Sequence, residues 1–312
     1  MDQQLIEQVL AMLQIESTDY RLIGGYCSNV FEVGAGRKLI VKILDNAVAL
    51  ETSTLAEMEW LACLCSQGIH VPRPVRILGQ DYIKRINNGF YFIVYNKIDG
   101  LPVNPASKEM WNARLFERWG ELLGQIHAAS QAYTANHVFP KWNESKMLLQ
   151  LEQAELHPHL AGKWLRYVDE LNQMKVSTDR FGLIHGDLHH GNLLINDNVL
   201  SVIDFGDCEY HWYAYDVAIV MYHTAQTVGK SEREQFIQAF CNYFMKGYVR
   251  GNPGTDVVQD LNYFIQYRHL YSFTYHMMYA DKSQLSRQQA EYLQAMEASL
   301  LKDEPYLNLI LS

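Results

Sequence analysis

The feature that most constrains the fold is a pair of short apolar runs, Leu193–Ile195 and Val199–Ile203, separated by Asn196-Asp197-Asn198. A run of Asn and Asp residues is typical of a tight turn, so the pattern predicts a β-hairpin. Such a hairpin brings Asn192, just before its first strand, next to Asp204, just after its second. An amide oxygen beside a carboxylate offers the oxygen ligands that Mg²⁺ requires, and the sequence therefore predicts a magnesium site here.

A glycine-flanked loop before the hairpin carries a further carboxylate, Asp187. A carboxylate in such a loop can reach the proton of a substrate hydroxyl group. Since imidazole and carboxylate groups also bind zinc, Asp187 with His185, His189 and His190 could instead form the metal cluster of a hydrolase. The zinc interpretation is the weaker one, because it gives no role to the amide and the carboxylate at the ends of the hairpin.

The N-terminal third has the pattern of an antiparallel sheet accompanied by helix. Short apolar runs parted by glycines predict strands, and apolar residues at intervals of three and four predict helices. The predicted strands are Tyr20–Ile23, Val30–Val33, Leu39–Leu44, Val75–Leu78 and Phe90–Tyr95, and the predicted helices are Leu5–Leu13 and Leu50–Ser66.

After Gly100 the pattern becomes mostly helical, apart from the strand-like stretch that contains the hairpin. The predicted helices are Glu109–Ala129, Glu144–Leu156, Lys163–Met174, Tyr213–Thr227, Arg233–Tyr248, Val257–Tyr275 and Arg287–Leu301. We therefore expect an α+β fold with two lobes. Residues 1–99 would form the smaller lobe, an antiparallel sheet with one helix, and residues 100–312 the larger, mainly helical lobe.

Composition narrows the class of partner. The chain of 312 residues has 26 Lys and Arg against 35 Asp and Glu, a formal net charge of −9, which argues against a nucleic-acid partner. Its 5 cysteines are an odd number and widely scattered, which favours a reducing compartment over a disulfide scaffold. With no signal-peptide pattern and no apolar run near the ~18 residues of a membrane span, we expect a cytoplasmic protein without a membrane partner.

The order of the polar residues resembles the catalytic and metal-binding loops of protein-kinase-like phosphotransferases. His185-Gly186-Asp187-Leu188-His189-His190-Gly191-Asn192 and the later Asp204-Phe205-Gly206 are similar to the loops of the aminoglycoside phosphotransferase and choline kinase family. The resemblance covers residues 22–221. It implies a two-lobed protein-kinase-like fold and the phosphorylation, with ATP and Mg²⁺, of a hydroxyl group on a small molecule.

The resemblance also implies a role for each matching residue. Asp187 would orient the attacking hydroxyl, and Asn192 and Asp204 would hold Mg²⁺. Lys42, in the middle of the apolar run 39–44, would contact the α- and β-phosphates of ATP, and Glu57 on the next helix would orient that lysine.

Further positions follow from the same resemblance. The backbone of Asn96 and Ile98 would bind the adenine edge, and Ser28 would cap the phosphates of the nucleotide. On the acceptor side, position and acidity single out Asp207, Glu209 and His211 as residues that would hold an amine or hydroxyl of the acceptor. Asp216 would be a structural carboxylate that caps backbone amides of the catalytic loop, and the tyrosines between residues 263 and 271 are explained by core packing.

The sequence also departs from protein kinases. It lacks the Arg of the His-Arg-Asp motif, the Ala-Pro-Glu signature and a recognisable activation segment, so control by phosphorylation of a loop is disfavoured. Two alternatives stay open: a Ser/Thr protein kinase of the same fold, and a catalytically silent nucleotide-binding regulator. The identity of the acceptor is also left open: similar chains act on aminoglycosides, amino alcohols such as choline, homoserine, and related hydroxylated amines.

Overall fold

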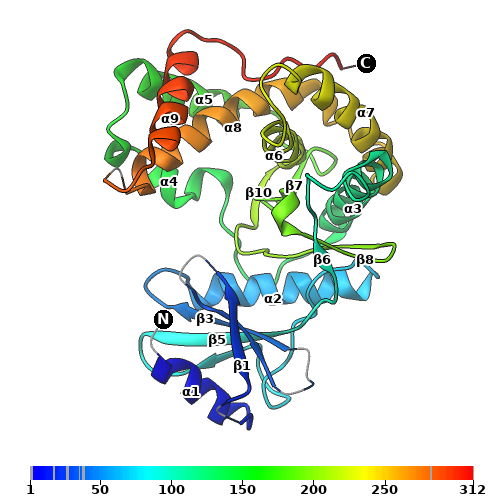
Figure 1. Cartoon of the computed structure of the whole chain (residues 1–312), viewed down its shortest axis with the longest axis vertical. Helices are drawn as coiled ribbons and strands as arrows, with labels where there is room; N and C mark the ends of the chain where they lie inside the picture. Colours follow the sequence, from blue (N-terminus) through cyan, green and yellow to red (C-terminus); the bar gives the residue numbers. More distant parts are fainter. Residues whose placement is uncertain are drawn as a thin grey trace. The chain divides into compact units, whose positions relative to one another are not determined.

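The computed structural model describes residues 3–16, 18–25, 28–34, 36, 39–281 and 283–311. The chain divides into two compact units, each built from several segments (Figure 1). Unit 1 comprises Met1–Val103, Tyr133–Phe139 and Gly191–Gly206, and unit 2 comprises Asn104–Ala132, Pro140–His190 and Asp207–Ser312. The segments Tyr133–Phe139 and Gly191–Gly206 thus belong to unit 1 together with the N-terminal part of the chain. The expected lobe boundary between residues 99 and 100 stays a prediction.

Unit 1 is built on an antiparallel sheet with the strand order β1-β2-β3-β5-β4. Its strands are β1 (Tyr20–Gly24), β2 (Val30–Val33), β3 (Leu39–Asp45), β4 (Ile83–Arg85) and β5 (Phe90–Asn96). The helices α1 (Gln3–Met12) and α2 (Glu51–Ser66) belong to the same unit. These bounds confirm the sequence-based strands except Val75–Leu78, where only Ile77 forms an isolated bridge because the chain turns directly after it.

The two helices of unit 1 cover opposite faces of this sheet (Figure 1). The α1 residues Leu5, Ile6, Val9 and Leu10 pack in one apolar cluster with alternate residues of the strands, among them Val41 and Ile43. Because successive side chains of a strand point to opposite faces, Lys42 lies on the other face. The helix α2 packs on that face, where Thr54 Oγ1 lies 2.8 Å from the Tyr91 hydroxyl. The alternation of β3 therefore directs Lys42 to the side of α2.

The predicted hairpin is present in unit 1 as β8 (Leu193–Asn196) and β9 (Val199–Val202). Leu193 pairs with Val202, and the strand β6 (Leu101–Pro102) adds to the free side of β8. Asp197, in the turn, has a φ of +50°, a conformation that Asp and Asn tolerate better than most residues. The composition of the turn thus specified its backbone geometry.

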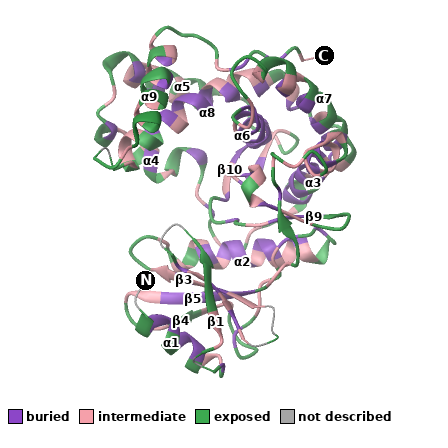
Figure 2. Ribbon diagram, in the orientation of Figure 1, coloured by how far each residue is buried: buried purple, intermediate pink, exposed green. Residues whose placement is uncertain are grey.

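Unit 2 is mainly helical, with one antiparallel pair of strands. Its elements are α3 (Ala113–Ala132), α4 (Lys146–Leu149), α5 (Pro158–Gln173), β7 (Phe181–Ile184), β10 (Glu209–Trp212), α6 (Tyr213–Ala225), α7 (Arg233–Gly251), α8 (Val258–Tyr279) and α9 (Arg287–Leu301). The helix α6 forms its core, since every residue from Tyr213 to Ala225 except His223 is buried (Figure 2). Among the described residues, none of the helices combines the length and apolarity needed to cross a membrane.

One predicted helix is broken. The pattern over Glu144–Leu156 predicts a continuous helix, whereas the structure has the 3₁₀ turn Trp142–Glu144, the short α4, and a second 3₁₀ turn, Leu151–Ala154. Ser145 caps α4 by accepting a hydrogen bond from the Leu148 N–H, and Glu155 ends the last turn with a φ of +50°. Local caps therefore divide a segment whose apolar periodicity reads as one element.

The closest helix packing in unit 2 depends on glycines at the contact between α3 and α7. An added Cβ at Gly120 would lie 1.9 Å from the Phe244 carbonyl oxygen, and one at Gly247 would lie 1.7 Å from the Glu117 carbonyl oxygen. Gly124 and Gly251 repeat the contact one turn further along each helix. Glycines at intervals of four thus let the two backbones touch, as small residues do wherever helices approach closely.

We predict that Gly247→Ala destabilises the protein by roughly 3 kcal/mol, because the new methyl group would force α3 and α7 apart. The free energy of unfolding from urea titrations monitored by circular dichroism measures this effect. The matched control is Gly162→Ala on α5, where an added Cβ meets nothing within 4 Å. That control should instead stabilise the helix by up to about 1 kcal/mol, and equal effects of the two changes would contradict the packing argument.

Candidate active site

An ion pair in unit 1 joins two of the predicted site residues. Lys42 Nζ on β3 lies 3.2 Å from Asp204 Oδ1, although 162 positions separate the two residues in the sequence. Asp204 follows β9 and has a φ of +64°, a left-handed conformation that is uncommon but that Asp tolerates better than most residues. Its side chain is 58% exposed, against 22% for Lys42. An accessible carboxylate therefore lies beside a mostly buried ammonium group.

Glu57 lies on α2, the helix on the same side of the sheet as Lys42. It is buried, and its Oε1 accepts a hydrogen bond of 2.8 Å from the Tyr95 hydroxyl. The backbone of Tyr95 on β5 pairs with Ile40 on β3, two residues before Lys42. The structure therefore holds the Glu57 carboxylate near the strand that carries Lys42, and its role in orienting that lysine stays a prediction.

The hairpin brings the backbones of Asn192 and of the residue before Asp204 together. The N–H of Ile203 donates a hydrogen bond of 3.0 Å to the Asn192 carbonyl oxygen. Asn192 and Asp204 thus supply amide and carboxylate oxygens at one end of the hairpin, and the carboxylate is accessible. Oxygen donors of this kind fit Mg²⁺ or another hard divalent cation, and metal binding by this pair stays a prediction.

The predicted nucleotide contacts of the backbone lie at the end of β5 and after β1. The Asn96 N–H donates a hydrogen bond of 2.9 Å to the Arg73 carbonyl oxygen, so an adenine contact of Asn96 would use its carbonyl group. Ile98 follows as a half-buried residue. Ser28 is exposed, with a φ of +51°, and its neighbours Tyr26 and Cys27 lie outside the described residues. These three assignments stay predictions.

In unit 2, Asp187 lies in the loop after β7 and contacts two nitrogen-bearing side chains. Its Oδ1 accepts a hydrogen bond of 3.1 Å from Arg268 Nη2, and its Oδ2 lies 3.6 Å from His189 Nε2. Sequence reasoning missed Arg268, because it lies within the aromatic stretch explained by core packing. A signal was present, since an arginine on the buried face of a helix needs an anionic partner.

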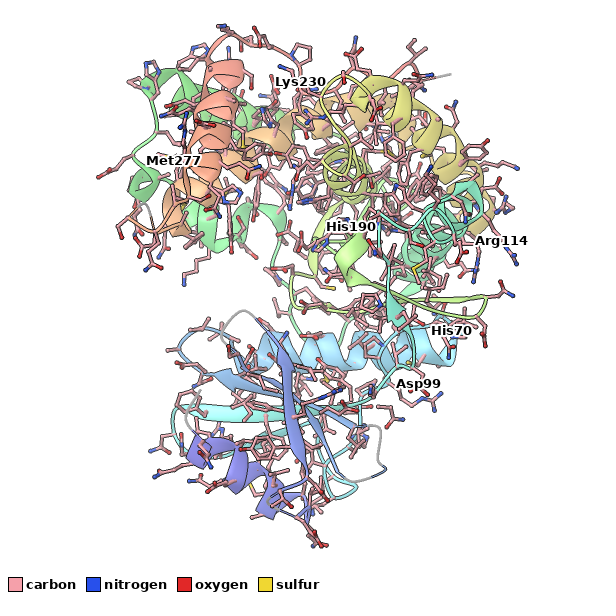
Figure 3. All side chains as sticks on the ribbon, viewed as in Figure 1. His70, Asp99, Arg114, His190, Lys230 and Met277 are labelled. Atoms are coloured by element: carbon pink, nitrogen blue, oxygen red, sulfur yellow. The ribbon has the colours of Figure 1, made fainter. Side chains whose placement is uncertain are left out.

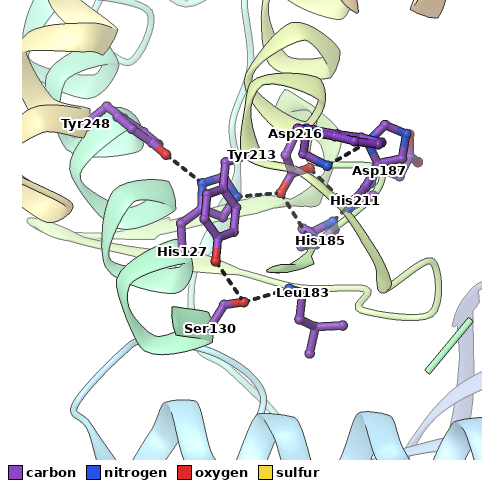
Figure 4. A network of polar contacts seen from close by, with 11 residues as sticks. His127, Ser130, Leu183, His185, Asp187, His211, Tyr213, Asp216 and Tyr248 are labelled. Atoms are coloured by element: carbon purple, nitrogen blue, oxygen red, sulfur yellow. Dashed lines mark hydrogen bonds and ion pairs between the residues drawn. The ribbon is translucent and has the colours of Figure 1, made fainter. Parts of the chain in front are cut away.

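Asp216 supports the loop of Asp187, as the sequence analysis expected. It is fully buried on α6, and its carboxylate accepts hydrogen bonds from the His185 N–H (2.8 Å) and the Gly186 N–H (3.1 Å). His127 Nε2 lies 3.1 Å from the same carboxylate, and His127 Nδ1 lies 2.8 Å from the Tyr248 hydroxyl (Figure 4). A single carboxylate on α6 thus fixes two consecutive amides of the loop.

Burial and hydrogen bonds together shift the pKa values of His127 and Asp216 in this network. Burial lowers the pKa of His127, although the hydrogen bond to Asp216 opposes this shift. Burial raises the pKa of Asp216, but the hydrogen bonds from His127 and from the His185 amide outweigh it, and the net shift is downward. The network therefore contains a neutral imidazole that donates to an ionised carboxylate.

Gly186 is required by the loop geometry. Its φ is +85°, and an added Cβ would lie 2.2 Å from the Asp207 carbonyl oxygen. The glycine before Asp187 therefore lets the loop pass close to the chain that enters β10.

The predicted acceptor residues have different surroundings. Asp207 is exposed, and Glu209 is half-buried on β10, where burial first and then Asp207 and Asp216 raise its pKa to about 8. His211 is 1% exposed, its ring stacks on that of Tyr215, and its Nδ1 accepts a hydrogen bond from the Trp212 N–H. A direct contact between His211 and an acceptor is therefore not supported, whereas Asp207 and Glu209 stay candidates.

The structure gives the zinc interpretation no support. No group of three or more His, Cys, Asp or Glu side chains in the described part of the chain is arranged to hold a metal ion. His190, labelled in Figure 3, lies edge-on to the Trp111 ring at a centroid distance of 5.9 Å, and burial lowers its pKa.

We predict that Glu209→Gln changes how stability depends on pH. The carboxyl group of Glu209 has a pKa raised to about 8 in the folded chain, so its contribution to stability is complete below pH 4.5 and is lost as the pH rises through 8. The glutamine variant should therefore gain roughly 4 kcal/mol relative to the wild type between pH 5 and pH 9, at about 1.4 kcal/mol per pKa unit. Urea unfolding at both pH values measures the gain, and Glu152→Gln, at an exposed position, should show none.

Comparisons with known proteins identify the family of this chain. The sequence profile described as "Phosphotransferase enzyme family" matches residues 19–253, more than half of the chain. Amicoumacin kinase of Bacillus subtilis (strain 168) is 28% identical over 265 residues, which are 80% of this chain and 77% of that protein.

Solved structures of kinases share the fold. Amicoumacin kinase hAmiN in complex with AMP-PNP, Ca²⁺ and Ami superposes with a TM-score of 0.89 at 23% identity, covering 99% of this chain and 96% of that one. The microcompartment-associated aminopropanol kinase has a TM-score of 0.73 at 20% identity, covering 97% of this chain and 99% of that one. The GDP complex of aminoglycoside 2'-phosphotransferase-IIIa has a TM-score of 0.61 at 20% identity, covering 95% and 97%. The predicted two-lobed protein-kinase-like α+β fold is confirmed.

Proposed function

Because this chain belongs to the phosphotransferase enzyme family, we propose that Asp187 is the residue that accepts the proton of the acceptor hydroxyl group during transfer. The enzyme itself is a small-molecule kinase, which uses ATP and a divalent metal to phosphorylate a hydroxyl group of its acceptor. A cytoplasmic location and the lack of a nucleic-acid partner, both expected from the sequence, remain predictions.

In this proposal, the residues that bind the phosphates of the nucleotide and the metal belong to unit 1. The observation that carries it is the 3.2 Å ion pair between Lys42 Nζ and Asp204 Oδ1, which unites a strand lysine and a hairpin carboxylate from distant parts of the sequence. Lys42 would bind the α- and β-phosphates, supported by Glu57, while Asn192 and Asp204 would hold the divalent metal. When bound, the metal offsets the negative charge of the triphosphate.

The acceptor end belongs to unit 2. The acceptor oxygen forms a bond to the γ-phosphorus, the bond from that phosphorus to the bridging oxygen breaks with its electron pair passing to ADP, and the hydroxyl proton passes to the Asp187 carboxylate. Since phosphoryl transfer requires little covalent chemistry from the protein, the main contribution of Asp187 is to orient the hydroxyl group. A carboxylate held by Arg268 and by a loop fixed on Asp216 suits that role.

We propose a hydroxylated amine of the amicoumacin type as the acceptor. Amicoumacin is what the Bacillus subtilis relative is named for, and the amicoumacin kinase hAmiN superposes over 99% of this chain. The carboxyl groups of Asp207 and Glu209, close in sequence to the hairpin, offer anionic contacts for an ammonium group. Binding of a cation beside Glu209 would favour its ionised form and so lower its pKa from about 8.

We expect ADP release to depend on an amine-bearing alcohol. A coupled assay of ADP with amicoumacin, 1-amino-2-propanol, kanamycin and casein as acceptors measures this, and mass spectrometry identifies the phosphate ester. Amicoumacin should give a kcat/KM at least about 10-fold above that of kanamycin, because a site with matched polar contacts discriminates strongly. Labelling of casein alone would favour the protein kinase, and ATP binding without ADP release from any acceptor would favour the silent regulator.

We predict that Asp187→Asn lowers kcat by roughly 100-fold or more while the dissociation constant of ATP changes by less than about 2-fold. Asparagine keeps the shape and the Oδ1 acceptor of the side chain but does not take up the proton. Steady-state kinetics and calorimetry of nucleotide binding test the two halves of this statement. Asp197→Asn in the turn between β8 and β9 is the matched control and should leave both values unchanged, whereas wild-type turnover in Asp187→Asn would remove Asp187 from the mechanism.

A further inference from the structure

We propose that Arg268 is the positioning residue of Asp187: its buried guanidinium group fixes the carboxylate in one orientation for the acceptor hydroxyl. This inference rests on the proposed role of Asp187 in proton transfer. It assigns a function to a side chain 81 positions further along the sequence, on α8, that none of the sequence motifs includes.

The guanidinium group is held on several sides. Nη2 donates to Asp187 Oδ1 at 3.1 Å and contacts His223 Nε2 at 2.9 Å, while Nη1 donates to the Tyr215 hydroxyl at 3.3 Å. The Tyr271 ring lies under the group, with its centroid 5.2 Å from Cζ. A planar group with contacts in its plane and on its face has little freedom to rotate, and the Asp187 oxygen bound to it shares that restriction.

The contact with His223 determines the state of that imidazole. Arginine has only donors, so the Nε2 of His223 must accept, and the ring is neutral with its proton on Nδ1. Burial, followed by the positive charge of Arg268, lowers the pKa of His223 well below its usual value. A neutral acceptor from α6 therefore binds one Nη2 hydrogen and directs the other to Asp187.

Burial gives the Arg268–Asp187 contact its strength. The Arg268 side chain is 10% exposed and that of Asp187 32% exposed, so water screens the pair less than it screens an ion pair on the surface. Burial by itself lowers the pKa of Arg268, but Tyr215 and Asp187 outweigh this, and the group remains a cation. A permanent cation at 3.1 Å therefore holds the Asp187 carboxylate in one orientation.

The test compares Arg268→Met, which removes the charge and the donors, with Arg268→Lys, which keeps a charged donor. We expect Arg268→Met to lower kcat about 100-fold, with the KM for ATP and the dissociation constant of ADP within roughly 2-fold of wild type. Arg268→Lys should recover at least about 10-fold of that loss. The assay is the same coupled ADP release, with the acceptor that the wild-type enzyme uses.

The matched control is Arg233→Met. Arg233 also lies over a tyrosine ring, that of Tyr306 at 5.1 Å, and donates from Nε to the Ala225 carbonyl oxygen at 3.1 Å. Its loss should lower the melting temperature but leave kcat within about 2-fold, since its contacts are with Tyr306 and the Ala225 backbone. A fall in kcat with both arginine variants would mark a general effect of destabilising unit 2 and would overturn the proposal.

A double-mutant cycle separates positioning from any other role. In the Asp187→Asn background, adding Arg268→Met should lower kcat by less than about 3-fold further, because the group that Arg268 positions has already lost its function. Additive losses would overturn the proposal, as would wild-type kcat in a folded Arg268→Met. If Arg268→Met does not fold, Arg268→Gln, which also removes the charge but keeps a polar side chain, is used in the same cycle with the same criteria.

The same experiment distinguishes this proposal from the proposed function. Wild-type turnover in Asp187→Asn means that the base is assigned wrongly, whatever Arg268 does. A large loss in Asp187→Asn together with normal kcat in Arg268→Met means that the base is assigned correctly and only the positioning role fails.

Discussion

The buried carboxylate of Asp216 is the interaction on which the loop of Asp187 depends. A charge removed from water must be compensated by hydrogen bonds, and Asp216 receives them from the amides of His185 and Gly186 and from His127. Because those amides belong to the loop, their hydrogen bonds to Asp216 fix the loop backbone. The position of Asp187, the residue that follows them, is thereby restricted. Gly186 completes the constraint, since only glycine fits its close approach to Asp207.

The geometry of unit 1 depends on a simpler rule, the alternation of side chains along a strand. Val41 and Ile43 face α1, so Lys42 has to face α2, the helix that carries Glu57. The hairpin adds Asp204, whose left-handed backbone presents its carboxylate to Lys42. Each functional side chain of this unit is therefore placed by an element whose pattern is local in the sequence.

This locality explains how much was predictable. The strands β1, β2, β3 and β5, the hairpin β8–β9 and most helices follow from apolar periodicity and turn composition, and motif residues such as Lys42 and Asp204 could be named from the sequence. The predictions of a strand over Val75–Leu78 and of a continuous helix over Glu144–Leu156 were wrong, because a turn after Ile77 and local caps determine those segments rather than periodicity. The family and the small-molecule kinase activity could also be predicted, whereas the roles of single residues remain for experiment.

The features that escaped prediction involve contacts between elements distant in the sequence. The glycines of α3 and α7 are spaced four apart in each helix, yet only their pairing shows that the backbones touch. Arg268 lies in an aromatic stretch that by itself indicates a core helix, and its partner Asp187 is 81 positions away. His211 was assigned to the acceptor by position and acidity, whereas its burial among aromatic rings does not support a direct contact.

Two neutral histidines make the charges of unit 2 compatible with burial. His127 donates to the carboxylate of Asp216, and His223 accepts from the guanidinium group of Arg268. Burial lowers the pKa of both rings, so each imidazole satisfies a charged neighbour without adding a charge of its own. A lysine or a carboxylate in either position would require a further counter-charge in the interior. The neutral imidazoles thus let Asp216 and Arg268 contact the Asp187 loop from different elements without adding a charge of their own.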